Sequence, residues 1–353
     1  MSEFDPPPNS MLVRVLIVDD SAFVRKVVRE MLSRSPFIDV VGMAHDGEEA
    51  LELADKLRPD VVTCDLTMPR MGGVEYVRRQ MAARPVPILM LTASPQDCAE
   101  ALDALAAGAV DLVQKPTAQA TDQLLAMREE LVEQVKAAGR TPVARLRTPP
   151  PSPKNVAAPS RRAGKVDVVV LGISTGGPQA LRYLVPQFPR DFPVPIAIVL
   201  HMPVGYTAMF AEKLSEISKL NVREARDGEE LLPGTALIAQ AGRHLLLKKD
   251  LSGALVAQFA TQPADKPHRP SVDVLFQSAA ESCRARVLGV VMTGMGDDGK
   301  QGAAWVKAQG GAILTEAEES CVIYGMPRSV VEAGLSDAAF SLSEMAEGIS
   351  NHL

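Results

Sequence analysis

The sequence predicts an α/β protein that consists of two doubly wound parallel-sheet domains. Short β-branched runs alternate with amphipathic helical patterns along most of the chain, as expected for successive βα units. The segment from Arg140 to Lys165 interrupts this alternation with six prolines, seven Lys or Arg residues and no acidic residue. Because such a segment cannot bury enough apolar surface to fold, it divides the chain into two domains.

The first predicted domain covers residues 11–138. Its β-branched runs predict five strands, at Val13–Val18, Val40–Ala44, Val61–Cys64, Ile88–Leu91 and Asp111–Val113. The amphipathic stretches predict five helices, at 21–33, 47–56, 72–83, 97–107 and 121–138. Five βα units in succession favour a parallel sheet with helices on both faces.

A Pro-rich basic linker is predicted over residues 139–164, as an extended and partly polyproline spacer. We interpret it as a solubilising linker; contact of its charge with an acidic surface is the alternative. The second predicted domain covers residues 165–353. Strands are predicted there at 167–171, 195–200 and 287–292, and a short hairpin at 244–258 around Asp250 and Gly253.

Charge and composition exclude several classes of protein. A formal net charge of −6 argues against a general nucleic-acid binder, which carries a basic face. No apolar run approaches the roughly 20 residues of a membrane span, and the N-terminus lacks the features of a signal peptide. The cysteines lack metal-site spacing and are predicted to be reduced, mostly buried thiols of a cytoplasmic protein: Cys64, Cys98, Cys283 and Cys321.

Charged and hydroxyl side chains follow four predicted strands of the first domain. They are Asp19, Asp20, Asp65, Thr92 and Lys115. In an open parallel sheet, ligands bind beyond the carboxyl ends of the strands. Three carboxylates that converge there need a cation, and hard oxygen ligands suit Mg²⁺. A lysine and a hydroxyl opposite would complete a cradle for a phosphoryl group.

Residues 12–135 resemble a response-regulator receiver domain, which has a flavodoxin-like fold. The resemblance implies that Asp65 accepts a phosphoryl group from a sensor histidine kinase. It also implies that Asp20, Asp65 and a backbone carbonyl near Thr67 hold Mg²⁺, with Asp19 nearby. Metal ligation is therefore expected at Asp19, Asp20 and Asp65.

The same resemblance implies that Thr92 and Lys115 contact the phosphate. The sequence departs from the family pattern at Leu112, three residues before Lys115, where the family usually has an aromatic switch residue. Phosphorylation is still expected despite this departure. The usual response to phosphorylation, in which the aromatic ring of this residue changes its orientation, is not expected to operate in the same form.

Ser174 lies in the sequence Gly172-Ile173-Ser174-Thr175-Gly176-Gly177-Pro178, directly after an apolar run. The G-x-S-x-G frame allows a sharp strand-to-helix turn that exposes the serine hydroxyl. A dinucleotide loop would need glycine at position 174, because a side chain blocks the approach of a pyrophosphate. Ser174 is therefore either a nucleophile or part of a plain strand–helix turn.

A serine nucleophile needs a base and a group that orients the base. His201 ends the run 196–200, which is predicted to be the strand beside that of Ser174, so it is the leading candidate among five histidines. A histidine that merely ends a strand is the alternative, and His244 and His268 are weaker candidates for the base. The turn after 287–292 offers Asp297 and Asp298, between which the chemistry alone does not decide.

Residues 166–350 resemble the catalytic domain of the chemotaxis protein-glutamate methylesterase family (CheB), a Rossmann-like fold that this family joins to a receiver domain. Four blocks carry the resemblance: Gly172–Pro178, 201–203, 269–273 and 293–299. It implies that Ser174 is the nucleophile, His201 the general base and Asp298 the residue that orients it.

The same resemblance implies that backbone N–H groups at Thr175 and Met295 form the oxyanion hole. The implied reaction removes methyl groups from glutamate methyl esters on chemoreceptor helices and releases methanol. Deamidation of receptor glutamines is the second implied activity. The catalytic domain is expected to need no cofactor, and neither nucleic acid nor membrane insertion is expected.

Control by the receiver is a further expectation from this resemblance: the unphosphorylated receiver covers the catalytic cleft, and phosphorylation relieves the inhibition. Two other functions stay open from the residues themselves. The first is a serine hydrolase for a small ester, because surface shape decides the substrate. The second is a receiver joined to a non-enzymatic binding domain.

Overall fold

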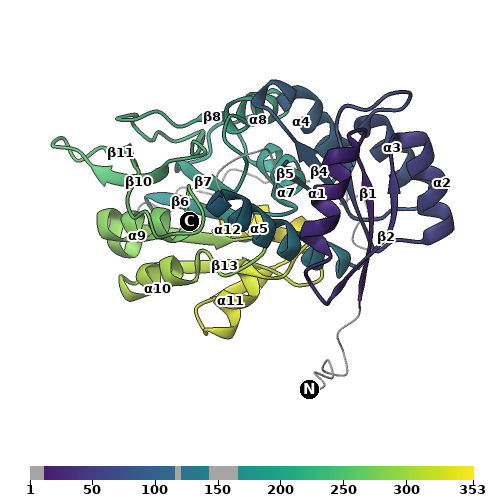
Figure 1. Ribbon diagram of the computed structural model, residues 1–353. Coiled ribbons are helices and arrows are strands. Elements are labelled where there is room, and N and C mark those ends of the chain that lie inside the picture. Colours follow the sequence, from purple (N-terminus) through teal and green to yellow (C-terminus); the bar gives the residue numbers. More distant parts are fainter. Residues whose placement is uncertain (1–11, 116–120, 143–165) are drawn as a thin grey trace, which may run out of the picture. The chain divides into compact units, whose positions relative to one another are not determined.

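The computed structural model describes residues 12–115, 121–142 and 166–353. The chain divides into two compact units between Arg147 and Thr148 (Figure 1). Most of the predicted linker, residues 143–164, lies outside the described residues. No helix in the described ranges is long and apolar enough to cross a membrane.

The first unit contains a five-stranded sheet in the order β2-β1-β3-β4-β5, with every pair parallel. This confirms the predicted doubly wound α/β class. All five predicted strands are present and extend the predicted ranges by at most two residues. The elements are β1 (Val13–Val18), α1 (Ala22–Leu32), β2 (Ile38–Ala44), α2 (Gly47–Leu57), β3 (Val61–Asp65), α3 (Gly73–Ala83), β4 (Ile88–Thr92), a short 3-10 turn η1 (Pro95–Asp97), α4 (Cys98–Ala107), β5 (Asp111–Gln114) and α5 (Thr121–Gly139).

Burial and capping explain this unit locally. Every residue of β3 and β4 is buried, as expected for central parallel strands covered on both faces. Asp46 begins α2 by accepting hydrogen bonds from the N–H groups of Glu48 and Glu49. Ser21 caps α1 in the same way, so α1 starts directly after the end of β1 that carries Asp19 and Asp20.

The second unit contains a seven-stranded parallel sheet in the order β14-β13-β12-β6-β7-β9-β8 and a separate hairpin of β10 and β11. Its elements are β6 (Val168–Ile173), α7 (Gly177–Leu184), η2 (Val185–Gln187), β7 (Ile196–Leu200), α8 (Thr207–Glu216), β8 (Asn221–Glu224), β9 (Thr235–Ile238), β10 (His244–Lys249), β11 (Leu255–Ala260), α9 (Val272–Cys283), η3 (Arg284–Arg286), β12 (Val287–Val291), α10 (Lys300–Ala308), β13 (Ala312–Glu316), α11 (Met326–Glu332), β14 (Ala338–Phe340) and α12 (Leu342–Asn351).

The three strands predicted from apolar runs and the hairpin are confirmed. Four strands of the sheet were not predicted: β8, β9, β13 and β14. Each has only three to five residues, and β8 buries one residue alone, so their sequences carry little periodic signal. Their pairing with neighbouring strands, not local pattern, makes them strands.

Helix α9 is fixed against the middle of the second sheet. Val168 and Val170, on one face of β6, belong to the same buried cluster as Leu275 and Phe276 of α9 and the inner side of β10. Gly172 lies so close to the start of α9 that a Cβ atom there would meet Val272 at 2.2 Å. The N-terminus of α9 is therefore held beside the end of β6.

Candidate functional site

Ser174 follows the central strand β6, which lies between β12 and β7. Its N–H donates to the carbonyl of Thr293 after β12 (3.0 Å), and its carbonyl accepts from Gly177 (2.7 Å). Gly176 has a φ of +81°, which glycine adopts without the strain that a side chain would bring. The sequence thus folds into the predicted sharp turn, but Ser174 is buried, at 8% exposure, where an exposed hydroxyl was expected.

His201 follows the neighbouring strand β7, and its N–H donates to the carbonyl of Ile173, the residue before Ser174 (3.1 Å). Its Nε2 lies 3.0 Å from a carboxylate oxygen of Asp298. Because a carboxylate only accepts, Nε2 carries a proton, so in the neutral ring the lone pair is on Nδ1. Nδ1 is buried and has no hydrogen-bond partner among the described residues, so Ser174 Oγ does not bond to it in this structure.

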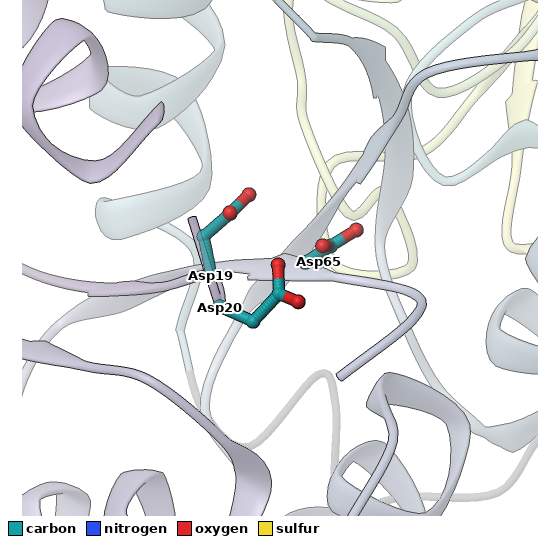
Figure 2. Close-up of side chains that lie close together, drawn as sticks. All are labelled: Asp19, Asp20 and Asp65. Carbon is teal, nitrogen blue, oxygen red and sulfur yellow. The ribbon is translucent and has the colours of Figure 1, made fainter. Parts of the chain in front are cut away.

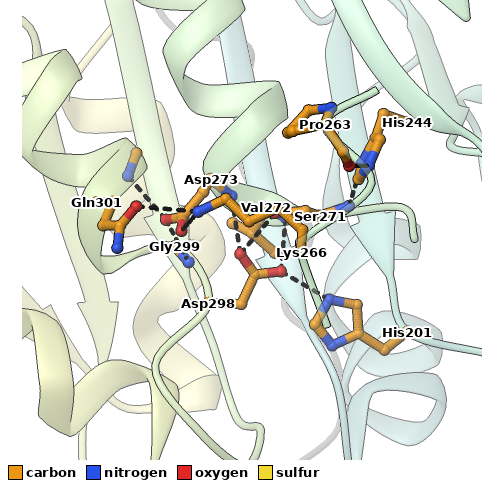
Figure 3. Close-up of polar contacts among 11 residues, drawn as sticks. His201, His244, Pro263, Lys266, Ser271, Val272, Asp273, Asp298, Gly299 and Gln301 are labelled. Atoms are coloured by element: carbon orange, nitrogen blue, oxygen red, sulfur yellow. Dashed lines mark hydrogen bonds and ion pairs between the residues drawn. The ribbon is translucent and has the colours of Figure 1, made fainter. Parts of the chain in front are cut away.

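Asp298 is held by the first turn of α9 as well as by His201 (Figure 3). Its carboxylate accepts from Ser271 Oγ (2.8 Å) and from the N–H groups of Val272 (2.8 Å) and Asp273 (3.0 Å). Burial alone would raise the pKa of Asp298. The hydrogen bond and charge of His201, with the two N–H groups, outweigh burial and hold this pKa well below its usual range.

The structure brings Asp298 to His201 and leaves Asp297 exposed. A second carboxylate fixes the turn that carries Asp298. Asp273 accepts from the N–H groups of Gly299 (2.9 Å) and Gly302 (2.8 Å), at the start of α10 (Figure 3). The N-terminal ends of α9 and α10 are thereby tied together beside Asp298, the hydrogen-bond partner of His201.

Thr175 follows Ser174 in its turn, and Met295 lies in the loop after β12. Thr293 joins the two segments, because its Oγ1 donates to the carbonyl of Thr175 at 3.0 Å. Gly294 packs against Ser174 so tightly that a Cβ atom would meet the serine Cβ at 2.7 Å. The N–H groups of Thr175 and Met295 donate no hydrogen bond to the described residues.

The two histidines that were weaker candidates for the base have other contacts. The ring of His268 stacks on that of His201, with centroids 4.2 Å apart. His244 accepts from the N–H of Ser271 (3.2 Å), and its Nε2 lies 3.0 Å from the carbonyl of Pro263. Burial lowers the pKa of His244, which fits a neutral ring that joins two segments of backbone.

The predicted strand-end residues of the first unit also converge (Figure 2). Asp19, Asp20 and Asp65 each bring a carboxylate oxygen within 4.8 Å of the others. Lys115 Nζ lies 2.7 Å from Asp65 and 3.0 Å from Asp19. Burial raises the pKa of Asp65, and Lys115 opposes that rise. Three hard oxygen donors beside one lysine fit Mg²⁺ and a phosphoryl group.

Thr92 and Leu112 lie on the neighbouring strands. Thr92 ends β4, is buried, and accepts a hydrogen bond at its carbonyl from the N–H of Lys115 (2.7 Å). Leu112 is buried in β5, at 4% exposure, so its side chain is part of the core. Thr67, the predicted source of a metal-ligating carbonyl, lies in the loop after β3.

Two family models match the chain: "CheB methylesterase" over residues 169–349 and "Response regulator receiver domain" over residues 15–127. A protein-glutamate methylesterase/protein-glutamine glutaminase of Myxococcus xanthus is 46% identical over 97% of this chain and 98% of its own length. One of Symbiobacterium thermophilum is 41% identical over 96% of each chain. The chain belongs to the CheB methylesterase family.

A solved structure agrees with this membership. The crystal structure of the Thermotoga maritima CheB methylesterase catalytic domain is 39% identical, with a TM-score of 0.52. It covers 53% of this chain, while this chain matches 99% of that domain. The expected parallel sheet of a CheB catalytic domain is thus confirmed for the second unit.

The sequence did not predict the hydrogen bonds that hold Asp298. Ser271 and Asp273 belong to one of the sequence blocks of the CheB resemblance, but no role was predicted for either. Serine and aspartate at the start of an amphipathic helix are a typical N-terminal signal. That signal could have placed a helix N-terminus here, although not the carboxylate that it binds.

Proposed function

We propose that this chain is a phosphorylation-regulated protein-glutamate methylesterase and protein-glutamine glutaminase that acts on chemoreceptors. The observation that carries this proposal is the hydrogen bond between His201 and Asp298 beside the turn of Ser174. The names of relatives that match nearly the whole chain support the substrate class. Because the substrate helices are cytoplasmic parts of receptors, we place the protein in the cytoplasm.

In the first step, Ser174 Oγ attacks the carbonyl carbon of the glutamate methyl ester, and Nδ1 of His201 takes the hydroxyl proton. The tetrahedral oxyanion accepts hydrogen bonds from the N–H groups of Thr175 and Met295. When the intermediate collapses, the C–O bond to the methoxy group breaks. The methoxy group takes the proton from His201 and leaves as methanol, so Ser174 carries the acyl group.

In the second step, a water molecule gives a proton to His201 Nδ1 and attacks the acyl carbon. The bond to Ser174 then breaks, the serine oxygen recovers its proton from His201, and glutamate is released. A glutamine side chain follows the same route with ammonia as the leaving group. Asp298 stays ionised throughout and stabilises the imidazolium that forms in each step.

The first domain supplies the control. Asp65 would accept a phosphoryl group from the phosphohistidine of a sensor kinase, with Lys115 and Thr92 as contacts of the phosphate. Asp19, Asp20 and Asp65 would hold Mg²⁺, which neutralises charge on the phosphoryl oxygens when bound. Lys115 lies within ion-pair distance of Asp65 and Asp19, which supports its proposed contact with the phosphate.

Methanol release from methylated receptor membranes tests this proposal. The wild-type protein, treated with a phosphodonor and Mg²⁺, should release methanol, and the receptor should lose the corresponding methyl esters. A small-ester hydrolase would instead cleave soluble methyl esters at higher kcat/KM and leave the receptor methylated. That outcome would refute the receptor as substrate while keeping the hydrolase chemistry.

A further inference from the structure

His268 covers one face of the imidazole of His201. The two ring centroids are 4.2 Å apart and the rings are inclined by only 20°. Asp298 holds one nitrogen of His201, but a single hydrogen bond leaves the ring free to turn about that contact. A second ring on its face removes this freedom and keeps water from that side, because stacked aromatic rings prefer a defined separation and tilt.

The segment that carries His268 is fastened to α9, which holds Asp298, and to α10. This segment, residues 261–271, connects β11 to α9. Lys266 Nζ donates to Asp273 Oδ2 and to Gln301 Oε1, each at 2.9 Å (Figure 3). Asp273 is the same carboxylate that ties α9 to the start of α10. One lysine thus joins the position of His268 to that of Asp298.

We propose that His268 is a positioning residue for the general base His201, and that Lys266 holds His268 in place from Asp273 and Gln301. The inference rests on the proposed function, since it needs His201 to be the base. Burial, followed by the charge of His201, lowers the pKa of His268 to about 4, so His268 is neutral at neutral pH. A neutral ring therefore faces the imidazolium formed during turnover, and repulsion between two cations is avoided.

Two substitutions of His268 in the full-length protein separate positioning from simple stability. His268→Ala removes the stacked ring and should lower kcat about 10- to 100-fold, with KM within about twofold. His268→Phe keeps a flat ring and should restore kcat to within about threefold of wild type. Rates are divided by the fraction of folded protein, which circular dichroism measures for each variant against wild type. Unchanged kcat in His268→Ala, or equal losses in both variants, would overturn the proposal.

Lys266→Met tests the second half of the proposal. It should lower kcat in the wild-type background and add no further loss to His268→Ala, because Lys266 acts through His268. Lys248→Met, at an exposed position on β10, is the control and should leave kcat unchanged. Fully additive losses would refute the coupling. A parallel Ser174→Ala variant identifies which idea fails: an inactive Ser174→Ala beside a fully active His268→Ala refutes only the positioning role.

Discussion

Asp298 accepts a hydrogen bond from Nε2 of His201 and is itself bound by the first turn of α9. The orienting carboxylate is thus part of a helix N-terminus, whose N–H groups favour negative charge. Burial of an aspartate normally disfavours ionisation, but in this site the hydrogen bonds prevail and the pKa of Asp298 is strongly lowered. The site therefore keeps its negative charge where an imidazolium must form.

Asp298→Asn is expected to lower kcat at least about 100-fold, because the amide carries no charge to stabilise the imidazolium. The neighbouring Asp297 is exposed and provides a matched control. Asp297→Asn should change kcat less than about threefold. Methanol release by both variants, at equal concentrations of folded protein, measures the difference. Equal losses would mean that Asp298 is not the residue that orients His201.

The pKa of His268 predicts how stability depends on pH. In the unfolded chain this histidine has its usual pKa near 6.5, whereas burial in the folded protein lowers the pKa to about 4. The unfolded state therefore binds more protons in that interval, and stability falls as the pH falls from about 6.5 to 4. His268→Phe should remove part of this fall, on the order of 2 kcal/mol. Urea unfolding at pH 7 and pH 4.5 measures it; identical pH dependence in both proteins would mean that burial of His268 does not cause the fall.

Asp65→Asn should abolish phosphorylation of the receiver domain. Acetyl phosphate should add one phosphate to the wild-type protein only when Mg²⁺ is present, because the three carboxylates require a cation to accept a phosphoryl group. Intact-mass spectrometry detects the added phosphate, and a chelator should prevent it. Asp60→Asn, in the turn before β3, is the control and should be phosphorylated normally. Phosphate on Asp65→Asn would place the site elsewhere.

Phosphorylation should raise methylesterase activity, as expected for a receiver joined to a catalytic domain. A fragment of residues 165–353 should turn over faster than the unphosphorylated full-length protein. The relative crystallised as a catalytic domain alone indicates that such a fragment folds. Addition of the separate receiver should restore little inhibition, because the covalent connection is lost. A folded fragment no faster than the intact chain would refute inhibition by the receiver.

Sequence patterns could predict the parts of the site that follow strands. Asp65, Thr92, Ser174 and His201 each come directly after a β-branched or apolar run, and parallel strands bring such ends to one edge of a sheet. The positions of Ser271 and Asp273 around Asp298 were not predictable in this way. They depend on α9 packing against β6 through long-range contacts, which no local pattern contains.

The same limit applies to the fold. The strands that were predicted are runs of β-branched or apolar residues, which carry their own signal. The three-residue strand β14 is a strand because it pairs with β13 at the edge of the sheet. His268 was noted only as a weak candidate for the base, since stacking between two rings far apart in the chain has no sequence signature.

The reaction of Ser174 with a fluorophosphonate tests most directly whether Ser174 is the nucleophile. The full-length protein, treated with a phosphodonor, is labelled, digested and mapped by mass spectrometry, and methanol release is measured in parallel. We expect one label, on Ser174, and a loss of both label and methanol release of about 10³-fold or more in Ser174→Ala. Ser252→Ala, in the exposed turn between β10 and β11, should behave as wild type. A label on another residue, or a Ser174→Ala variant that keeps more than about a tenth of the methanol release, would contradict the role of Ser174 as nucleophile.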